Sequence, residues 1–204
     1  ISPTRELSLQ IKDVIQKIQF GLKSYCCYGG HNIQSELNNL QNPPDILIGT
    51  PGRLADHLRR ESISLNKTKL LVLDEFDKIL ELGFSKEMSF IIEHLKQPLD
   101  LQFLTSATQL EVLPNYLNRE RQIHLDYNQK TANKKLTIKA LIGKRVDKDV
   151  RLINLVTILS HEPTLIFCNQ RLVVEEIGHL IQNKGFICAI FHGGLEQKER
   201  ELTL

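Results

Sequence analysis

The chain has 204 residues, of which 41% are hydrophobic and 25% are charged, and its formal net charge is +2. This composition is ordinary for a folded protein of one or two domains, and no apolar run reaches the ~18 residues of a membrane span. A charge this close to zero favours neither nucleic acid nor any other charged partner. The four cysteines form no Cys-x-x-Cys pair, so we expect reduced thiols in an intracellular, cytoplasmic protein with no membrane contact.

The first half of the chain alternates between predicted helices and strands. We predict helices from Pro3, over 33–40, from Pro51, over 86–96 and over 110–117, and strands over 23–28, 45–49, 70–73, 101–105 and 122–125. Two helix starts are marked by Thr4 beside Pro3 and by Thr50 before Pro51, because threonine caps helices and proline suits their first turn. Short apolar runs that end at turns are typical of buried strands in a parallel sheet.

The same alternation starts again after residue 135. Residues 127–135 are polar and lack periodicity, so we predict a linker between a first domain over 1–126 and a second over 136–204. The second domain is expected to have strands over 136–142, 163–168 and 186–191, and helices over 148–159, over 172–183 and from Leu195. Alternating strands and helices predict an α/β fold, with parallel sheets in two domains and a cleft between them.

The most informative stretch is the apolar run 70–73, which is followed at once by three carboxylates. They are Asp74, Glu75 and Asp77. Ligand sites in open α/β sheets collect beyond the carboxyl ends of such strands. Adjacent carboxylates raise each other's pKa unless a cation is shared between them, and Mg²⁺ on a nucleotide phosphate is the usual cation. The alternative is an ordinary helix start, with Asp74 as the N-cap.

Seven motifs follow one another along the chain. They are Pro3-Thr4-Arg5-Glu6-Leu7, Gly29-Gly30, Thr50-Pro51-Gly52-Arg53, Asp74-Glu75-Phe76-Asp77, Ser106-Ala107-Thr108, Leu165-Ile166-Phe167-Cys168-Asn169, and His192-Gly193-Gly194 with Gln197 and Arg200. In order and spacing, this set resembles the DEAD-box ATP-dependent RNA helicases of superfamily 2 over nearly the whole chain. The resemblance implies two RecA-like parallel-sheet domains joined by a short linker, with ATP and RNA bound across the cleft.

The resemblance assigns the ATP side of the site to two strand ends. Asp74 would hold the Mg²⁺ of ATP through water, and Glu75 would orient and activate the attacking water, since phosphoryl transfer depends on positioning and charge stabilisation. Asp77 would accept hydrogen bonds from Ser106 and Thr108, which would tie the nucleotide state to domain closure. The alternative for the two hydroxyl residues is a satisfied turn.

The residues matched to RNA-binding positions lie at strand ends and helix starts. They are Thr4, Arg5, Gly30, Thr50, Gly52 and Arg53 in the first half, and Asn169, Gly193, Gln197 and Arg200 in the second. Helix N-termini attract phosphates, and contacts to the RNA backbone imply little sequence preference. The alternatives are plain turns at the glycines, a helix cap at Thr50, contacts of Arg5 and Arg53 with neighbouring turns, and a solvated charge at Arg200.

Two departures from the family pattern bear on function. Phe76 replaces the usual alanine, which we expect to affect packing rather than chemistry. The sequence has no Gly-x-x-x-x-Gly-Lys-Ser/Thr phosphate loop, which the family places before Pro3, with its arginine motifs after Leu204. We therefore expect the middle of a longer helicase that hydrolyses ATP very poorly on its own. A non-hydrolysing RNA-binding scaffold and a DNA-directed relative are alternatives, and protein adaptors are further possible partners.

Overall fold

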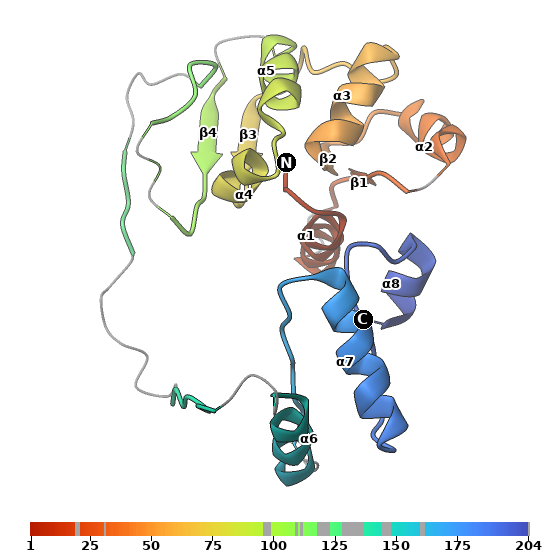
Figure 1. Ribbon diagram of the computed structural model, residues 1–204. Coiled ribbons are helices and arrows are strands. Elements are labelled where there is room, and N and C mark those ends of the chain that lie inside the picture. Colours follow the sequence, from red (N-terminus) through yellow and green to blue (C-terminus); the bar gives the residue numbers. More distant parts are fainter. Residues whose placement is uncertain are drawn as a thin grey trace. The chain divides into compact units, whose positions relative to one another are not determined.

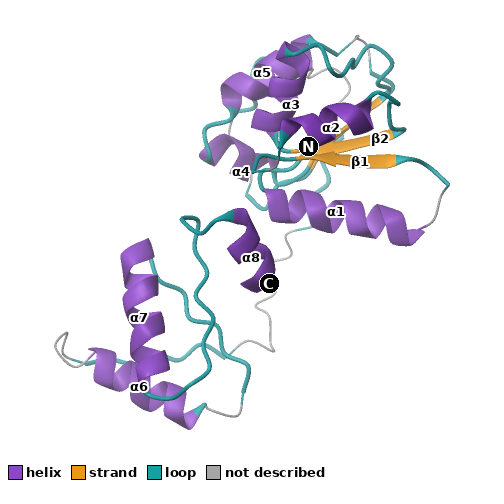
Figure 2. Cartoon of the chain, turned by 90° about the vertical axis from the view of Figure 1, so that its right-hand side faces the viewer, coloured by secondary structure: helices purple, strands orange, loops and turns teal. Residues whose placement is uncertain are grey.

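Figures 1 and 2 show a computed structural model of the chain, which divides into two compact units, Ile1–His124 and Leu125–Leu204. The structure describes residues 1–18, 21–30, 32–95, 99–108, 110, 112–117, 123–127, 137–143, 148–159 and 162–203. The first unit has α1 (Arg5–Ile18), β1 (Ser24–Cys27), α2 (Ile33–Leu40), β2 (Ile46–Gly49), α3 (Pro51–Arg59), β3 (Leu70–Leu73), α4 (Phe76–Glu81), α5 (Ser85–Glu93) and β4 (Leu101–Leu104). The described part of the second unit has α6 (Lys148–Ile158), α7 (Arg171–Asn183) and α8 (Gln197–Thr203).

Two pairs of parallel strands form the scaffold of the first unit. β1 pairs with β2, and their last residues, Cys27 and Gly49, are partners in the register. β3 pairs with β4 in the same way, so that Leu73 lies beside Leu104. Because the strands of each pair are parallel and end in register, the turns that follow them emerge at a common edge.

The first two residues of the chain connect the two strand pairs. The backbone N–H of Ser2 donates to the carbonyl of Gly49 at 3.1 Å, and the backbone N–H of Asp74 donates to the carbonyl of Ile1 at 2.9 Å. Gly49 ends β2 and Asp74 directly follows β3, so the carboxyl ends of β2 and β3 are brought together. The motif residues that follow these strands are therefore collected in one region of the first unit.

A hydrophobic core packs the strands against α3, α4 and α5. Leu73, Phe76, Ile79 and Met88 are completely buried in it, and burial of a side chain of this size contributes about 1.5–3 kcal/mol. Phe76 thus fills the core instead of facing a ligand. The expected packing role of this residue is confirmed, and the expectation that the replacement leaves the chemistry unchanged stays a prediction.

Several expected elements of the first unit differ from the structure. The helix predicted over 110–117 is not formed in the residues described there, because Pro114 has no N–H for a helical hydrogen bond. Residues 123–125 form no strand, and α4 is a separate helix that the sequence analysis considered only as the helix-start alternative after Asp74. β3 is not buried on both faces, since Leu70 and Val72 are 50% and 40% exposed.

The second unit shows the predicted helices but not the predicted strands. Residues 137–143, 163–168 and 186–191 form no hydrogen-bonded ladder, and Leu165, Phe167 and Ile187 are largely exposed. A strand needs a neighbour to bond its backbone and a layer to cover its apolar face, and an apolar run supplies neither by itself. Of the predicted linker, only Tyr127 lies within the described residues. None of the described helices is long and apolar enough to cross a membrane.

Candidate functional site

The ends of β3 and β4 hold two polar side chains against each other. The hydroxyl of Thr105 donates to Oδ1 of Asp74 at 2.6 Å, and it accepts a hydrogen bond from the backbone N–H of Glu75 at 3.1 Å. The carbonyl of Thr105 accepts from the backbone N–H of Phe76 at 2.9 Å. Three consecutive residues after β3 are therefore fixed by one residue after β4, and the Asp74 carboxylate has a defined orientation.

Glu75 has a backbone conformation that is unusual for a residue with a side chain. Its φ and ψ are 49° and 51°, in the left-handed region, which costs about 1–2 kcal/mol for a residue other than glycine. Glu75, not Asp74, is the cap residue of α4, and its side chain makes no capping hydrogen bond. A helix does start here, with Asp77 in its first turn as the alternative proposed, but side-chain capping does not account for Asp74 or Glu75. Strained backbone of this kind clusters at functional sites.

Asp77 is buried and is held by the turn that follows β4. Its Oδ2 accepts hydrogen bonds from the hydroxyl of Thr108 at 2.9 Å and from the backbone N–H of Thr108 at 3.2 Å. The predicted bond from Ser106 is wrong, because the Ser106 hydroxyl donates to the carbonyl of Thr108 instead. Burial acts to raise the pKa of Asp77, but the Thr108 hydroxyl and the backbone N–H groups of Lys78 and Thr108 outweigh it, so this pKa lies below its ordinary value.

The first predicted RNA-binding residues lie together where α1 begins. The hydroxyl of Thr4 accepts a hydrogen bond from the backbone N–H of Leu7 at 3.3 Å, so Thr4 caps α1. The guanidinium of Arg5 lies beside Gly29, where an added Cβ would stand 3.4 Å from Nη2. Gly30 has a φ of 97°, which a residue with a side chain rarely adopts. The Gly29-Gly30 turn is thus placed against the N-terminus of α1.

The other predicted RNA-binding residues of the first unit lie where α3 begins. Thr50 is buried and is the N-cap residue of α3 before Pro51, as predicted, although its side chain makes no capping hydrogen bond. Its backbone N–H donates to the carbonyl of Cys27 at 3.2 Å, which ties the ends of β1 and β2 together. Arg53 is 12% exposed and its Nε donates to Oε2 of Glu36 at 2.7 Å. The sequence analysis left two options for Arg53, a contact with an RNA phosphate or a contact with a neighbouring segment. The structure shows a contact of the second kind, with Glu36 on α2.

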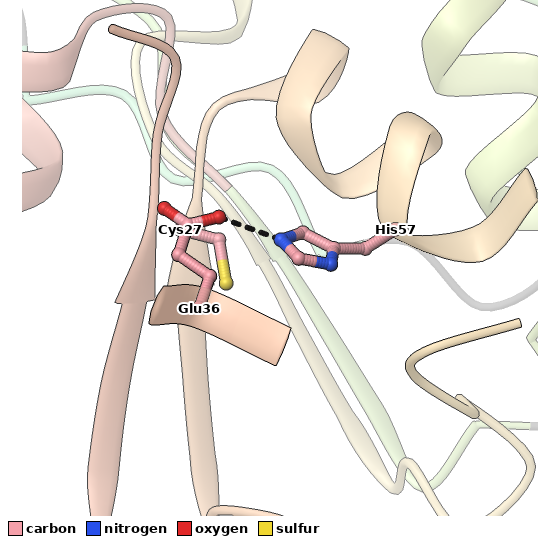
Figure 3. Close-up of side chains that lie close together, drawn as sticks. All are labelled: Cys27, Glu36 and His57. Atoms are coloured by element: carbon pink, nitrogen blue, oxygen red, sulfur yellow. Dashed lines mark hydrogen bonds and ion pairs between the residues drawn. The ribbon is translucent and has the colours of Figure 1, made fainter. Parts of the chain in front are cut away.

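Glu36 also belongs to a cluster of metal-ligand types that the sequence analysis did not find. The ligand atoms of Cys27, Glu36 and His57 lie within 4.8 Å of one another, and all three residues are buried (Figure 3). Burial strongly raises the pKa of the Cys27 thiol and keeps it protonated. Oε2 of Glu36 already accepts from Nε2 of His57 at 2.6 Å and from Arg53. A cation would have to displace the Arg53 guanidinium, so the cluster is a self-satisfied polar network.

The predicted RNA-binding residues of the second unit lie at the starts of α7 and α8. Asn169 precedes Gln170, the cap residue of α7, and Gln197 begins α8. A Cβ added to Gly193 would stand 3.8 Å from Nη2 of Arg171. The guanidinium of Arg200 lies over the ring of Phe191, with 5.3 Å from Cζ to the ring centroid. Arg200 is therefore partly buried against a ring and is not a fully solvated charge.

The structure adds Thr105, Glu36 and His57 to the residues proposed from sequence. Thr105 has a sequence signal, because it directly follows an apolar strand and precedes Ser106. Glu36 and His57 have none, since each is one polar residue among others on an amphipathic helix. Asp74, Asp77 and Thr108 are brought together as expected. The binding of ATP and RNA across a cleft between the domains stays a prediction.

A sequence model of the DEAD/DEAH box helicase family matches residues 1–114. The DEAD-box ATP-dependent RNA helicase CshB of Bacillus subtilis is 33% identical over 213 residues, which cover 100% of this chain and 48% of CshB. The ATP-dependent rRNA helicase RRP3 of Lodderomyces elongisporus is 31% identical over 206 residues, which cover 98% of this chain and 41% of RRP3. The chain thus spans less than half the length of these two relatives.

Among solved structures, Saccharomyces cerevisiae Dbp5 bound to RNA and ADP BeF3 matches with a TM-score of 0.76 and 20% sequence identity. The match covers 100% of this chain and 52% of that chain. At this identity the likeness shows the fold. The predicted α/β fold with RecA-like parallel sheets is confirmed.

Proposed function

Since this chain belongs to the DEAD/DEAH box helicase family, we propose that it forms part of an ATP-dependent RNA helicase that unwinds or remodels RNA duplexes. The observation that carries this proposal is the Asp74 carboxylate, held by the Thr105 hydroxyl at 2.6 Å beside the strained Glu75. A scaffold that binds RNA without hydrolysis has no use for a fixed carboxylate and a costly backbone conformation at this place.

We propose that the carboxylates after β3 serve Mg²⁺ and ATP. Magnesium bound to ATP neutralises phosphate charge during phosphoryl transfer, and a site of one or two carboxylates with retained waters suits this ion. Asp74 would accept hydrogen bonds from water on the ion, and its orientation is set by the Thr105 hydroxyl. Glu75 is exposed, so it can orient the attacking water and accept its proton. Asp77 holds Thr108 and so connects the turns after β3 and β4.

The RNA-binding surface that we propose is made of helix starts and glycine turns. Thr4, Arg5, Gly30, Thr50, Gly52 and Arg53 supply it in the first unit, and Asn169, Gly193, Gln197 and Arg200 in the second. The N-termini of α1 and α3 provide backbone N–H groups and a positive dipole end for phosphates. Gly52 leaves room above the helix start, because an added Cβ would meet nothing closer than Phe84 at 3.8 Å. Backbone contacts of this kind bind RNA with little sequence preference.

We propose a reducing cellular setting for the protein. All four cysteines are free thiols, which supports a reducing, cytoplasmic setting. Protein adaptors are proposed as a further class of partner.

The proposal is tested by measuring ATP hydrolysis with and without single-stranded RNA. A polypeptide extended at both ends, so that it includes a phosphate loop and the second-domain arginine motifs, should show RNA-stimulated hydrolysis. The 204-residue chain should be at least about tenfold slower, because the lysine and backbone cradle for the phosphates are not among its residues. Equal activity of the two polypeptides, or stimulation by DNA as strong as by RNA, contradicts the proposal.

A further inference from the structure

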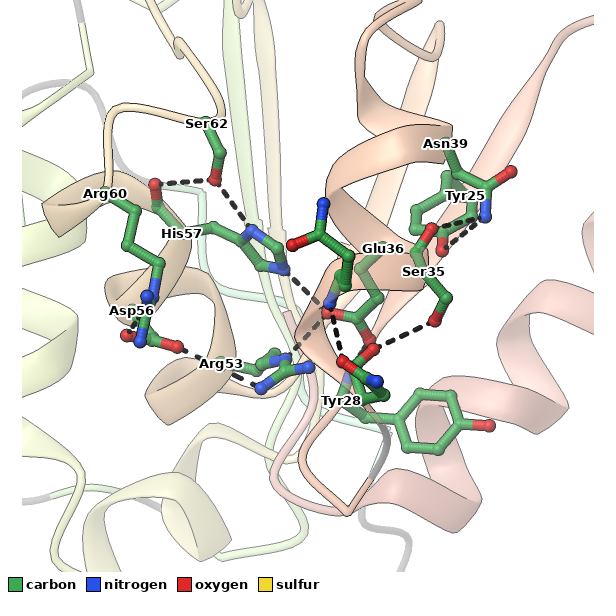
Figure 4. A network of polar contacts seen from close by, with 12 residues as sticks. Tyr25, Tyr28, Ser35, Glu36, Asn39, Arg53, Asp56, His57, Arg60 and Ser62 are labelled. Carbon is green, nitrogen blue, oxygen red and sulfur yellow. Dashed lines mark hydrogen bonds and ion pairs between the residues drawn. The ribbon is translucent and has the colours of Figure 1, made fainter.

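One buried carboxylate in the first unit is shared by three segments of the chain (Figure 4). The side chain of Glu36, on α2, is 5% exposed. Its Oε2 accepts from Arg53 at 2.7 Å and from His57 at 2.6 Å, and its Oε1 accepts from the backbone N–H of Tyr28 at 3.4 Å. A buried charge is stable only when it is paired and hydrogen-bonded, so these contacts hold the segments together.

Two of the three donors to Glu36 belong to or adjoin the segments assigned above to RNA binding, the Gly29-Gly30 turn and the first turn of α3 from Thr50 to Arg53. Tyr28 immediately precedes Gly29-Gly30, and Arg53 ends the turn that starts at Thr50. His57 lies one helical turn after Arg53 on the same face of α3, and its Nδ1 contacts the hydroxyl of Ser62 at 2.8 Å. His57 is completely buried, so it acts on Glu36 without reaching any ligand.

We propose that Glu36 is a positioning residue for RNA binding, which holds the Gly29-Gly30 turn and the Thr50–Arg53 turn in one fixed arrangement. This inference rests on the proposed function. Glu36 fixes the guanidinium of Arg53 and the spacing of the two turns before RNA arrives, so the ordering of the surface does not subtract from the free energy of binding. His57 contacts the same carboxylate oxygen as Arg53, and so helps to fix the orientation of the carboxylate.

The test uses Glu36→Gln in the 204-residue chain, with two measurements. Amide hydrogen exchange at Gly29, Gly30 and Gly52, followed by NMR without RNA, reports the order of the turns. Binding of a fluorescent single-stranded uridine decamer reports RNA affinity. Loss of the charge that holds Arg53 should speed exchange at both turns and weaken RNA binding about tenfold, within the range of couplings between contacting residues. Glu93→Gln is the matched control, since this exposed carboxylate on α5 contacts the Ser89 hydroxyl.

A second variant keeps the test valid if Glu36→Gln does not fold. His57→Leu leaves the Glu36–Arg53 ion pair intact but removes a donor that cannot touch RNA, and it should weaken RNA binding by roughly threefold. If both variants bind RNA as tightly as the wild type, the positioning role of Glu36 is overturned, but the proposed function is not. A wild-type chain that does not bind the decamer overturns the proposed function as well. Unchanged exchange at Gly30 and Gly52 in Glu36→Gln also overturns the positioning role.

Discussion

The Thr105 hydroxyl lies 2.6 Å from Oδ1 of Asp74 and bridges the ends of two parallel strands. The same oxygen accepts from the backbone N–H of Glu75. One hydroxyl therefore sets both the orientation of the carboxylate proposed to serve Mg²⁺ and the backbone of the residue proposed to activate water. Ser106, which the sequence analysis had paired with Asp77, is one position further along and contacts its own turn.

Thr105→Val should raise the Mg²⁺ concentration needed for ATP hydrolysis. The substitution keeps the shape but removes the hydroxyl, and loss of a partner that orients a metal-binding group costs about 10–100-fold in metal affinity or activity. Steady-state ATPase assays of the extended polypeptide at several Mg²⁺ concentrations measure the effect. Thr157→Val is the control, because that hydroxyl donates to the carbonyl of Ile153 on α6. An unchanged Mg²⁺ dependence contradicts the role of Thr105.

Thr108→Val should raise the pKa of Asp77, because it removes the side-chain hydrogen bond that stabilises the carboxylate. In the wild type this pKa is lowered by folding, so Asp77 stabilises the fold above its unfolded pKa, and this contribution is lost as the pH falls through the folded value. The variant should lose about 1.5–3 kcal/mol at neutral pH, as expected for a hydrogen bond to a charged group. Urea unfolding and carboxyl NMR titration measure the two effects, and an Asp77 pKa that does not move refutes the account.

Glu75→Gly should make the chain more stable while it removes the proposed catalytic carboxylate. Glycine removes the backbone strain of the left-handed conformation, which costs about 1–2 kcal/mol. The greater freedom of glycine in the unfolded chain offsets about 0.5–1 kcal/mol of this gain in stability. Glu61→Gly is the matched control, since Glu61 has a φ of 56° and no proposed role in catalysis. Both variants should unfold at higher urea concentrations, but only Glu75→Gly should lose ATPase activity in the extended polypeptide. A destabilised Glu75→Gly chain would contradict the strain argument.

Gly52→Ala should separate RNA binding from stability. The added methyl group meets Phe84 at an ordinary contact distance of 3.8 Å, and alanine in place of glycine stabilises a helix by about 0.5–1 kcal/mol. RNA affinity should nevertheless fall, because the methyl group stands where the phosphate backbone is proposed to approach α3. Gly30→Ala is the comparison, since its φ of 97° predicts losses of both stability and affinity. Undiminished RNA affinity in Gly52→Ala argues against backbone contact there.

The sequence predicted those features that depend on local pattern. The bounds of β3 follow from four apolar residues before a run of acids, and the start of α3 follows from Thr50 before Pro51. The strand-end rule correctly placed Asp74 and Thr108 in one region, because parallel strands that end in register carry their following turns to one edge. The break at Pro114 was also readable, and it was missed because the apolar spacing on either side is helical.

The remaining features depend on tertiary structure. Which hydroxyl meets Asp74 is decided by the register of β3 and β4, and a shift of one residue exchanges Thr105 for Ser106. Glu36 and His57 are 21 residues apart, and only the packing of α2 against α3 brings them within 2.6 Å. The apolar runs around Leu165 and Ile187 have the composition of strands, but strand formation requires hydrogen-bonded neighbours, which composition does not specify.

The most direct test of the central claim is Glu75→Gln in the extended polypeptide, assayed for RNA-stimulated ATP hydrolysis. The amide keeps the size of the carboxylate but cannot accept the proton of the attacking water, so turnover should fall by at least about a hundredfold while binding of ATP and RNA persists. Fluorescence measurements of nucleotide and RNA binding on the same preparation confirm that the sites are intact. RNA-stimulated hydrolysis at the wild-type rate would contradict the assignment of this chain to an RNA-dependent ATPase that uses Glu75.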